Sequence, residues 1–242
     1  MGIFGNSKIT EKQDSGKKPT GPDHLNIQLR KLLELGKIEL SKGNYSEAKT
    51  LLDTALRVVK KMAEYPQSFN EADVLNFLSL IYSRISSIYF RLGDYASSLK
   101  VSIENVDRLH RLEALYPRFH PDLVIIAIQN MIVTYTYIAD CYNLLGDHEN
   151  ALKYATLALS RCKDETNKWG LSELVDSYYY TEVSMARILC DMHDPEKALP
   201  CCKEFDFICQ IIPDYLDSQN GQKFHANIIA MQKQIMKTGT YK

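Results

Sequence analysis

The sequence lacks an excess of charge of either sign. Its 29 basic side chains are balanced by 30 acidic ones, which gives a formal net charge of −1. Such a balance supplies no overall electrostatic field that would attract nucleic acid or an anionic membrane. We therefore expect no nucleic-acid partner.

Long apolar runs and dense cysteines are lacking as well. No apolar run approaches the roughly 18 residues that a membrane-spanning helix needs, and the N-terminus has no apolar stretch typical of a secretory signal. The six cysteines among 242 residues are too few and too unevenly placed for a small disulfide scaffold. We expect no transmembrane segment, a cytoplasmic location and cysteines that remain thiols.

Two regions differ in composition. Residues 1–23 hold four of the eleven glycines, two of the eight prolines and many charged side chains. Such a stretch cannot bury enough apolar surface to offset the entropy lost on ordering it. We predict a flexible N-terminal tail over 1–23 and a helical domain over 24–242.

Apolar residues recur every three or four positions from Asp23 to about Met236. This spacing is typical of amphipathic helices, and short breaks divide it into nine helical segments. No strict alternation of apolar and polar residues lasts long enough to indicate a sheet. The predicted fold class is therefore all-α.

Four of the breaks share one layout. They read Gly43-Asn44, Gly93-Asp94, Gly146-Asp147 and His193-Asp194. Glycine just past a helix end adopts a left-handed conformation cheaply, and the Asn or Asp after it caps the next helix. Each break therefore predicts a helix, a tight turn and a second helix.

Small side chains recur around these turns. In each case, twelve residues separate a small residue in the first helix from one in the second: Gly36 and Ala48, Ser86 and Ser98, Ala139 and Ala151, Ala186 and Ala198. Small residues at these points let two antiparallel helices approach closely.

This layout resembles the tetratricopeptide repeat. The resemblance implies a right-handed α-solenoid of four helix pairs with a concave groove. We expect a ninth helix, about Gln222 to Lys237, to cap the last pair, because stacked repeats leave an apolar face at each end. The turns lie 50, 53 and 47 residues apart, whereas the family period is about 34.

The chain is thus similar to long-helix variants with a period near 50, such as the repeats of kinesin light chains and of the soluble attachment proteins that recruit a membrane-fusion ATPase. It departs from the family pattern in places. Asn105 and Phe205 replace an expected alanine, Glu39 and Leu189 an expected aromatic. Pro200 lies inside the second helix of the fourth pair, so we expect that helix to kink or to begin late.

Motifs of enzymes are missing from the sequence. It has no glycine-rich phosphate loop, G-x-S-x-G elbow or H-E-x-x-H pair. Cys190, Cys201, Cys202 and Cys209 lie close together, but none forms the C-x(2–4)-C pair that zinc sites favour. We expect packed thiols, no metal, no cofactor and no enzymatic activity.

The resemblance also implies where a partner would bind. In the family, fixed positions of each first helix line the groove, and their charges here indicate a weak preference for acidic segments. A lysine replaces the asparagine that holds chaperone C-termini in related proteins, so we do not expect chaperone-tail binding. The predicted groove residues are Arg30, Lys37, Ser87, Phe90, Arg91, Thr136, Asp140, Asn143, Tyr180 and Arg187.

The predicted function is that of an adaptor or scaffold that binds a partner peptide or helix in the groove. The alternative is a structural or membrane-trafficking subunit tethered by its N-terminus. Met1 to Lys8 resembles a myristoylation site with Gly2 as the acceptor, although Asn6 stands where serine or threonine is usual. A single myristoyl chain would give only marginal, peripheral membrane contact.

Overall fold

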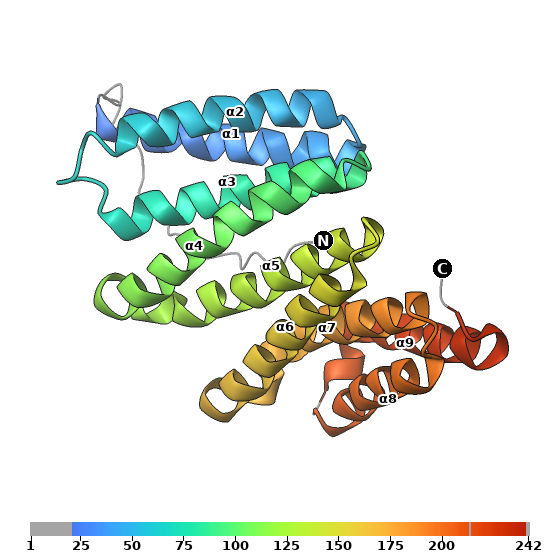
Figure 1. Ribbon diagram of the computed structural model, residues 1–242. Helices are drawn as coiled ribbons and strands as arrows, with labels where there is room; N and C mark the ends of the chain where they lie inside the picture. Colours follow the sequence, from blue (N-terminus) through green and yellow to red (C-terminus); the bar gives the residue numbers. More distant parts are fainter. Residues whose placement is uncertain (1–20, 213, 241–242) are drawn as a thin grey trace. The chain divides into compact units, whose positions relative to one another are not determined.

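The computed structural model describes residues 21–212 and 214–240 (Figure 1). Within these residues there are nine α-helices, two short 3₁₀ helices and no strand, so the predicted all-α class is confirmed.

The chain divides into two compact units between Ile126 and Ala127, inside α5. Unit 1 holds α1 (Pro22–Lys42), α2 (Tyr45–Met62), α3 (Glu71–Arg91), α4 (Tyr95–Phe119) and η1 (Pro121–Leu123). Unit 2 holds most of α5 (Val124–Leu144), then α6 (His148–Trp169), α7 (Leu171–Asp191), α8 (Pro195–Ile211), η2 (Tyr215–Asp217) and α9 (Gln219–Thr238).

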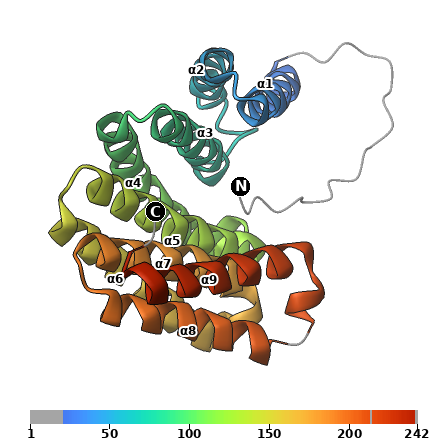
Figure 2. The same ribbon diagram turned by 90° about the vertical axis from the view of Figure 1, so that its right-hand side faces the viewer.

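Consecutive helices pack against each other in both units. In unit 1, α1 packs along α2 and α3 along α4, and α2 also packs against α3. In unit 2, α7 packs between α6 and α8, and α9 lies against α8 and α7 (Figure 2). The ring of Tyr154 on α6 lies against Tyr135 and Tyr142 of α5, with centroids 6.2 and 5.6 Å apart. The predicted order of helix pairs followed by a ninth helix is confirmed.

The four repeat turns share one backbone conformation. The angle φ is 82° at Gly43, 78° at Gly93, 83° at Gly146 and 61° at His193. This left-handed region costs a side chain with a Cβ roughly 1–2 kcal/mol, whereas glycine enters it freely. The fourth turn therefore carries backbone strain that the other three lack.

Aspartates cap three of the second helices. Asp94, Asp147 and Asp194 each accept a hydrogen bond from the backbone N–H three residues later, at 3.1, 3.1 and 3.2 Å. The same prediction is wrong for Asn44, whose side-chain amide instead donates to Glu39 Oε2 at 2.6 Å. A hydrogen bond to a charged carboxylate is stronger than one between neutral groups, so Glu39, which is absent from the other repeats, holds the Asn44 side chain.

The small side chains lie where the paired helices come closest. All eight predicted positions are buried. A Cβ at Gly36 would lie 3.4 Å from the side chain of Leu52, in direct van der Waals contact with it, so a side chain longer than a methyl group would have to displace Leu52. The predicted close approach is therefore confirmed.

Buried hydrogen bonds replace apolar contact in the second pair. The Ser86 hydroxyl on α3 lies 2.9 Å from that of Ser98 and 2.7 Å from that of Ser102 on α4. Asn105, where the family has alanine, donates from Nδ2 to the Ser79 carbonyl at 3.3 Å. The three serine hydroxyls satisfy one another across the α3–α4 contact, and Asn105 adds a hydrogen bond to α3, although its Oδ1 has no partner in the described residues.

Two predicted helix ends differ from the observed ones. Helix α8 begins at Pro195 and continues through Pro200 to Ile211, so the expected late start is wrong. Asp194 as the cap and Pro195 in the first turn fix its beginning there. Helix α9 begins at Gln219 rather than Gln222. The Ser218 hydroxyl caps it there by accepting a hydrogen bond from the backbone N–H of Gly221 at 2.9 Å.

Helix α9 covers the last pair as predicted. Phe224, Ile228, Met231 and Ile235 are buried, and Ile229 is half-buried. The rings of Phe224 and Tyr179 stack with their centroids 3.9 Å apart. The apolar stripe of α9 therefore closes the core of α7 and α8.

Helix α5 is more apolar than expected. Among the described residues it is the one helix that is long and apolar enough to cross a membrane by length and composition, although 56% of its most apolar window is buried inside the protein. The core helix of a soluble protein passes the same test, so this indication of a membrane span is weak.

The cysteines are free thiols packed in unit 2. Five are buried and Cys201 is half-buried. Burial raises the pKa of the Cys162 and Cys202 thiols to about 12, which keeps both protonated. The described ranges contain no group of three or more His, Cys, Asp or Glu side chains arranged to hold a metal ion.

Close helix approach predicts the effect of Ala151→Leu. Ala151 is fully buried between α5 and α6, and forcing a larger side chain into a packed core costs about 1–3 kcal/mol. We expect urea denaturation to show a loss of this size. Ala230→Leu on the exposed side of α9 is the control and should change stability little, because both residues favour helices; equal losses would contradict the packing account.

The strained turn predicts a stabilising change. His193→Gly should raise the free energy of unfolding by about 1 kcal/mol, because glycine removes the left-handed penalty at a modest entropic cost. His193→Ala keeps the Cβ and should bring no gain. The two variants are compared by chemical denaturation, and a gain from alanine equal to that from glycine would show that the imidazole, not the backbone, is responsible.

Candidate functional site

The predicted groove residues of unit 1 lie on its two first helices. Arg30 and Lys37 are exposed on α1 and Arg91 is exposed on α3. Ser87 and Phe90 are half-buried on α3, and the Phe90 ring packs edge to face on Tyr95 with centroids 5.3 Å apart. All five side chains reach or approach the surface.

We define the unit 1 face as the residues 13, 9, 6 and 2 positions before the turn glycine of each first helix. This spacing follows one side of a helix. The face consists of Arg30, Glu34, Lys37 and Ser41 on α1 and Leu80, Arg84, Ser87 and Arg91 on α3. It carries four cations and one anion.

Arg84 was not among the predicted site residues, and it connects the two helices of this face. Its Nη1 donates to the Leu33 carbonyl of α1 at 2.5 Å. Burial lowers the pKa of Arg84, and the nearby Glu34 carboxylate opposes that shift. The signal that identifies it is its register, since Arg84 precedes Gly93 by as many residues as Glu34 precedes Gly43.

Two cations of the unit 1 face make no internal contact. Neither Lys37 nor Arg91 forms a hydrogen bond or ion pair with a side chain in the described ranges, whereas Arg30 Nε donates to Asn26 Oδ1 at 3.2 Å. Their charges are therefore directed only to solvent or to a ligand.

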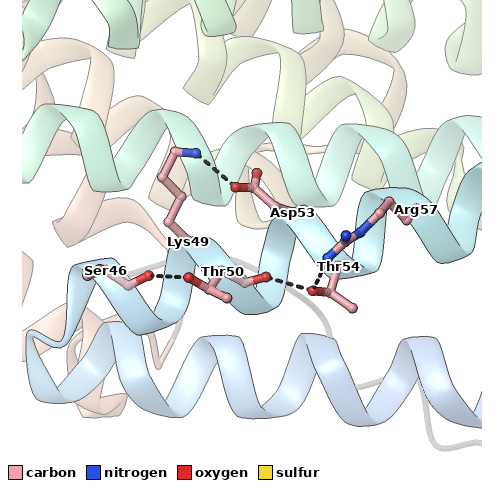
Figure 3. Close-up of polar contacts among 6 residues, drawn as sticks. All are labelled: Ser46, Lys49, Thr50, Asp53, Thr54 and Arg57. Atoms are coloured by element: carbon pink, nitrogen blue, oxygen red, sulfur yellow. Dashed lines mark hydrogen bonds and ion pairs between the residues drawn. The ribbon is translucent and has the colours of Figure 1, made fainter.

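The second helix α2 shows the opposite arrangement (Figure 3). Thr50 and Thr54 donate to backbone carbonyls one turn earlier, at 3.0 and 2.9 Å, and Arg57 donates to the Thr54 hydroxyl at 2.9 Å. Lys49 pairs with Asp53 at 2.9 Å. Polar groups on this side of α2 are satisfied within the helix, so they offer less to a partner.

The predicted groove residues of unit 2 form a polar ladder between α5 and α7. The hydroxyls of Thr136 and Thr181 lie 3.3 Å apart, and Asn143 Nδ2 donates to Asp191 Oδ2 at 2.6 Å. Thr136 and Asn143 are each only 4% exposed. Both side chains therefore join helices rather than face a ligand.

The middle of the ladder is an ion pair. Asp140 Oδ1 accepts from the Ser184 hydroxyl at 2.7 Å and lies 3.5 Å from Arg187 Nη1. Burial raises the pKa of Asp140, while Arg187 and Ser184 hold it down. Because Arg187 is already paired, its charge is partly neutralised.

Tyr180 is half-buried against α9. Its ring packs edge to face on Phe224, with centroids 5.5 Å apart. Burial, with Asp176 nearby, raises the pKa of Tyr180 to about 12. This tyrosine supports the α7–α9 contact.

The proposed lipidation site, Gly2, lies outside the described residues.

Sequence patterns did not reveal one unusual buried acid. Glu182 on α7 is fully buried, and no nitrogen or oxygen in the described part of the chain hydrogen-bonds to its carboxyl group. Burial raises its pKa to about 8 and the neighbouring Glu204 adds to the shift, whereas the Cys201 thiol and Lys163 oppose it. Glu182 is therefore largely protonated at neutral pH.

Glu182 predicts a pH-dependent stability. Between the ordinary pKa of 4.5 and about 8, the unfolded chain loses this proton while the folded chain keeps it. The folded state then binds more protons, so stability is highest below this window and falls as pH rises through it. Glu182→Gln mimics the neutral acid and should remove that decline.

Thermal unfolding of both proteins from pH 4.5 to 8.5 measures the effect. Glu204→Gln, whose side chain is 43% exposed, serves as the matched control and should keep most of the wild-type decline. Parallel curves for the wild type and Glu182→Gln would contradict the assignment.

Comparison with known proteins identifies one repeat in the chain. Residues 134–165 match the tetratricopeptide repeat family, and the match spans the end of α5, the third turn and most of α6. No curated protein matches the chain. Among solved structures it is similar to a de novo designed helical repeat protein, with 14% sequence identity, a TM-score of 0.34, and coverage of 90% of this chain and 96% of that one. The chain thus carries a tetratricopeptide repeat at residues 134–165, a unit that typically serves in protein–protein interaction and is usually non-catalytic.

Proposed function

We propose that the chain is a non-enzymatic adaptor that binds an acidic peptide or helix of another protein on the unit 1 face. The observation that carries this proposal is that Lys37 and Arg91 are exposed on that face and have no hydrogen-bond or ion-pair partner in the described ranges. A charged side chain that already has a partner within the protein must break that contact before it can bind a ligand. Lys37 and Arg91 have no such contact to break in the described ranges.

The composition of the unit 1 face supports an acidic partner. Arg30, Lys37, Arg84 and Arg91 outnumber Glu34, so the face attracts carboxylates and steers their approach. Arginine in particular binds a carboxylate through two parallel hydrogen bonds. Leu80 and Phe90 lie on the same helix as Arg84 and Arg91. Both are half-buried, so their accessible parts offer apolar contact to a partner.

The polar ladder of unit 2 supports the choice of unit 1. Its members Thr136, Asp140, Asn143 and Arg187 are occupied by neighbouring side chains. A ligand that contacted them would have to replace buried hydrogen bonds, each worth about 0.5–1.5 kcal/mol net. Partner binding through these residues is therefore less favourable than through the unit 1 face.

Charge reversal tests the proposal. A partner is first identified by affinity capture from the native cell and is then titrated calorimetrically. We expect Lys37→Glu and Arg91→Glu each to weaken its affinity by about tenfold or more, because like charges would then face each other. Binding should also weaken with added salt.

Lys60→Glu is the matched control, because Lys60 is an exposed cation on α2 outside the unit 1 face. It should leave affinity close to the wild-type value, and circular dichroism should show all variants folded. Unchanged affinity in both Lys37→Glu and Arg91→Glu would overturn the proposal.

A further inference from the structure

Helix α1 exposes apolar side chains on the side away from its core. Leu29, Leu33 and Gly36 are buried against the rest of unit 1. On the opposite side, Ile27 is 56% and Ile38 is 37% exposed. Covering these two isoleucines with another apolar surface would remove them from water, which is favourable.

The exposed side of α1 has the spacing of a helix-pairing seam. Ile27, Lys31, Glu34 and Ile38 are separated by four, three and four residues, which keeps one line of a helix facing a partner helix. We call these four residues the α1 seam. All four side chains are exposed, and none of them forms a hydrogen bond or ion pair in the described ranges, although the Glu34 carboxylate lies near Arg84 of α3.

The next first helix shows what normally covers these positions. Ile81 and Ile88 of α3 precede Gly93 by the same distances as Lys31 and Ile38 precede Gly43, and both isoleucines are fully buried. Helix α3 packs there against α2 of the preceding pair. In the described residues no helix precedes α1, so the equivalent side of α1 stays open.

The α1 seam is complementary to itself when two copies run antiparallel. Pairing about a point between Leu32 and Leu33 places Ile27 opposite Ile38 of the second copy. The same pairing places Lys31 opposite Glu34, and two-fold symmetry repeats both contacts. A parallel pairing would instead set Lys31 against Lys31 and Glu34 against Glu34, which is repulsive.

We propose that two copies of this chain associate through their α1 seams as antiparallel helices. The outer contacts are isoleucine pairs and the two central contacts are lysine–glutamate pairs. The central charges fix the register and direction, as charged positions do in coiled coils. A single helix pair buries less than most stable interfaces, so the dimer forms in a concentration-dependent manner.

The α1 seam contains neither Lys37 nor Arg91, although it shares Glu34 with the unit 1 face. A dimer would present two unit 1 faces and would bind a partner with two acidic segments more tightly than a monomer does. Self-association is measured without any partner, so it stands or fails independently of the proposed function.

Analytical ultracentrifugation of the purified full chain tests the proposal. We expect the weight-average mass to rise with concentration from 27.7 kDa toward twice that value. Lys31→Glu and Glu34→Lys should each remain monomeric, because each substitution sets like charges against each other at both central contacts. The double variant with both substitutions should dimerise again.

Mixing provides the sharpest readout. Equal amounts of the Lys31→Glu and Glu34→Lys variants should form a heterodimer, because their central charges are complementary across an antiparallel pair. Misfolding of either variant would not produce this recovery. Ile38→Glu should also give a monomer, whereas Leu92→Glu, at a leucine 59% exposed in the same unit, should still dimerise.

Three results would overturn the proposal. The first is a wild-type chain that stays monomeric at every concentration. The second is a dimer that persists in Ile38→Glu, which would place the interface elsewhere. The third is a failure of the mixed charge variants to associate while the wild type dimerises, which would exclude the antiparallel register.

Discussion

The structure depends on how closely the two helices of each pair approach each other. Gly36, Ser86, Ala139 and Ala186 remove the side-chain bulk that would hold the first helix away from the second. Leu52 packs directly beside Gly36, so a side chain longer than a methyl group would have to displace it. Dispersion contacts weaken rapidly with distance, and a small separation therefore determines how much packing energy each pair gains.

The turns make this approach possible because they leave each chain segment little freedom. A left-handed residue reverses the chain immediately after the first helix, and an aspartate cap begins the second helix at once. Helices of 17 to 25 residues, rather than the turns, account for a period near 50 instead of about 34 residues. Where the turn residue is His193, the same geometry persists against a steric penalty, which shows that the packing of α7 and α8 imposes it.

The two units use polar residues differently. In unit 1 the hydroxyls of Ser86, Ser98 and Ser102 satisfy one another inside the α3–α4 contact, while Lys37 and Arg91 are exposed and have no polar partner in the part of the chain that the structure describes. In unit 2 the ladder around Asp140 ties α5 to α7 at the positions where unit 1 exposes its cations. Equivalent positions of one repeat therefore stabilise the fold in unit 2 and are open to a ligand in unit 1.

The sequence by itself determined the elements that follow from local chemistry. Helix periodicity, the left-handed glycines, the three aspartate caps and the twelve-residue spacing of small residues are short-range patterns, and all can be recognised without knowing the fold. The cap helix was predictable for the same reason, because its stripe of Phe224, Ile228, Met231 and Ile235 requires an apolar surface to cover.

Only the tertiary structure decided which polar residues are available. Arg91 and Arg187 look alike in sequence, yet one faces solvent and the other pairs with Asp140, because pairing depends on residues more than forty positions away. The burial of Glu182 and the exposure of Ile27 and Ile38 likewise follow from which helix packs on each face. Contacts between distant segments set burial and charge pairing, and a local pattern contains no information about them.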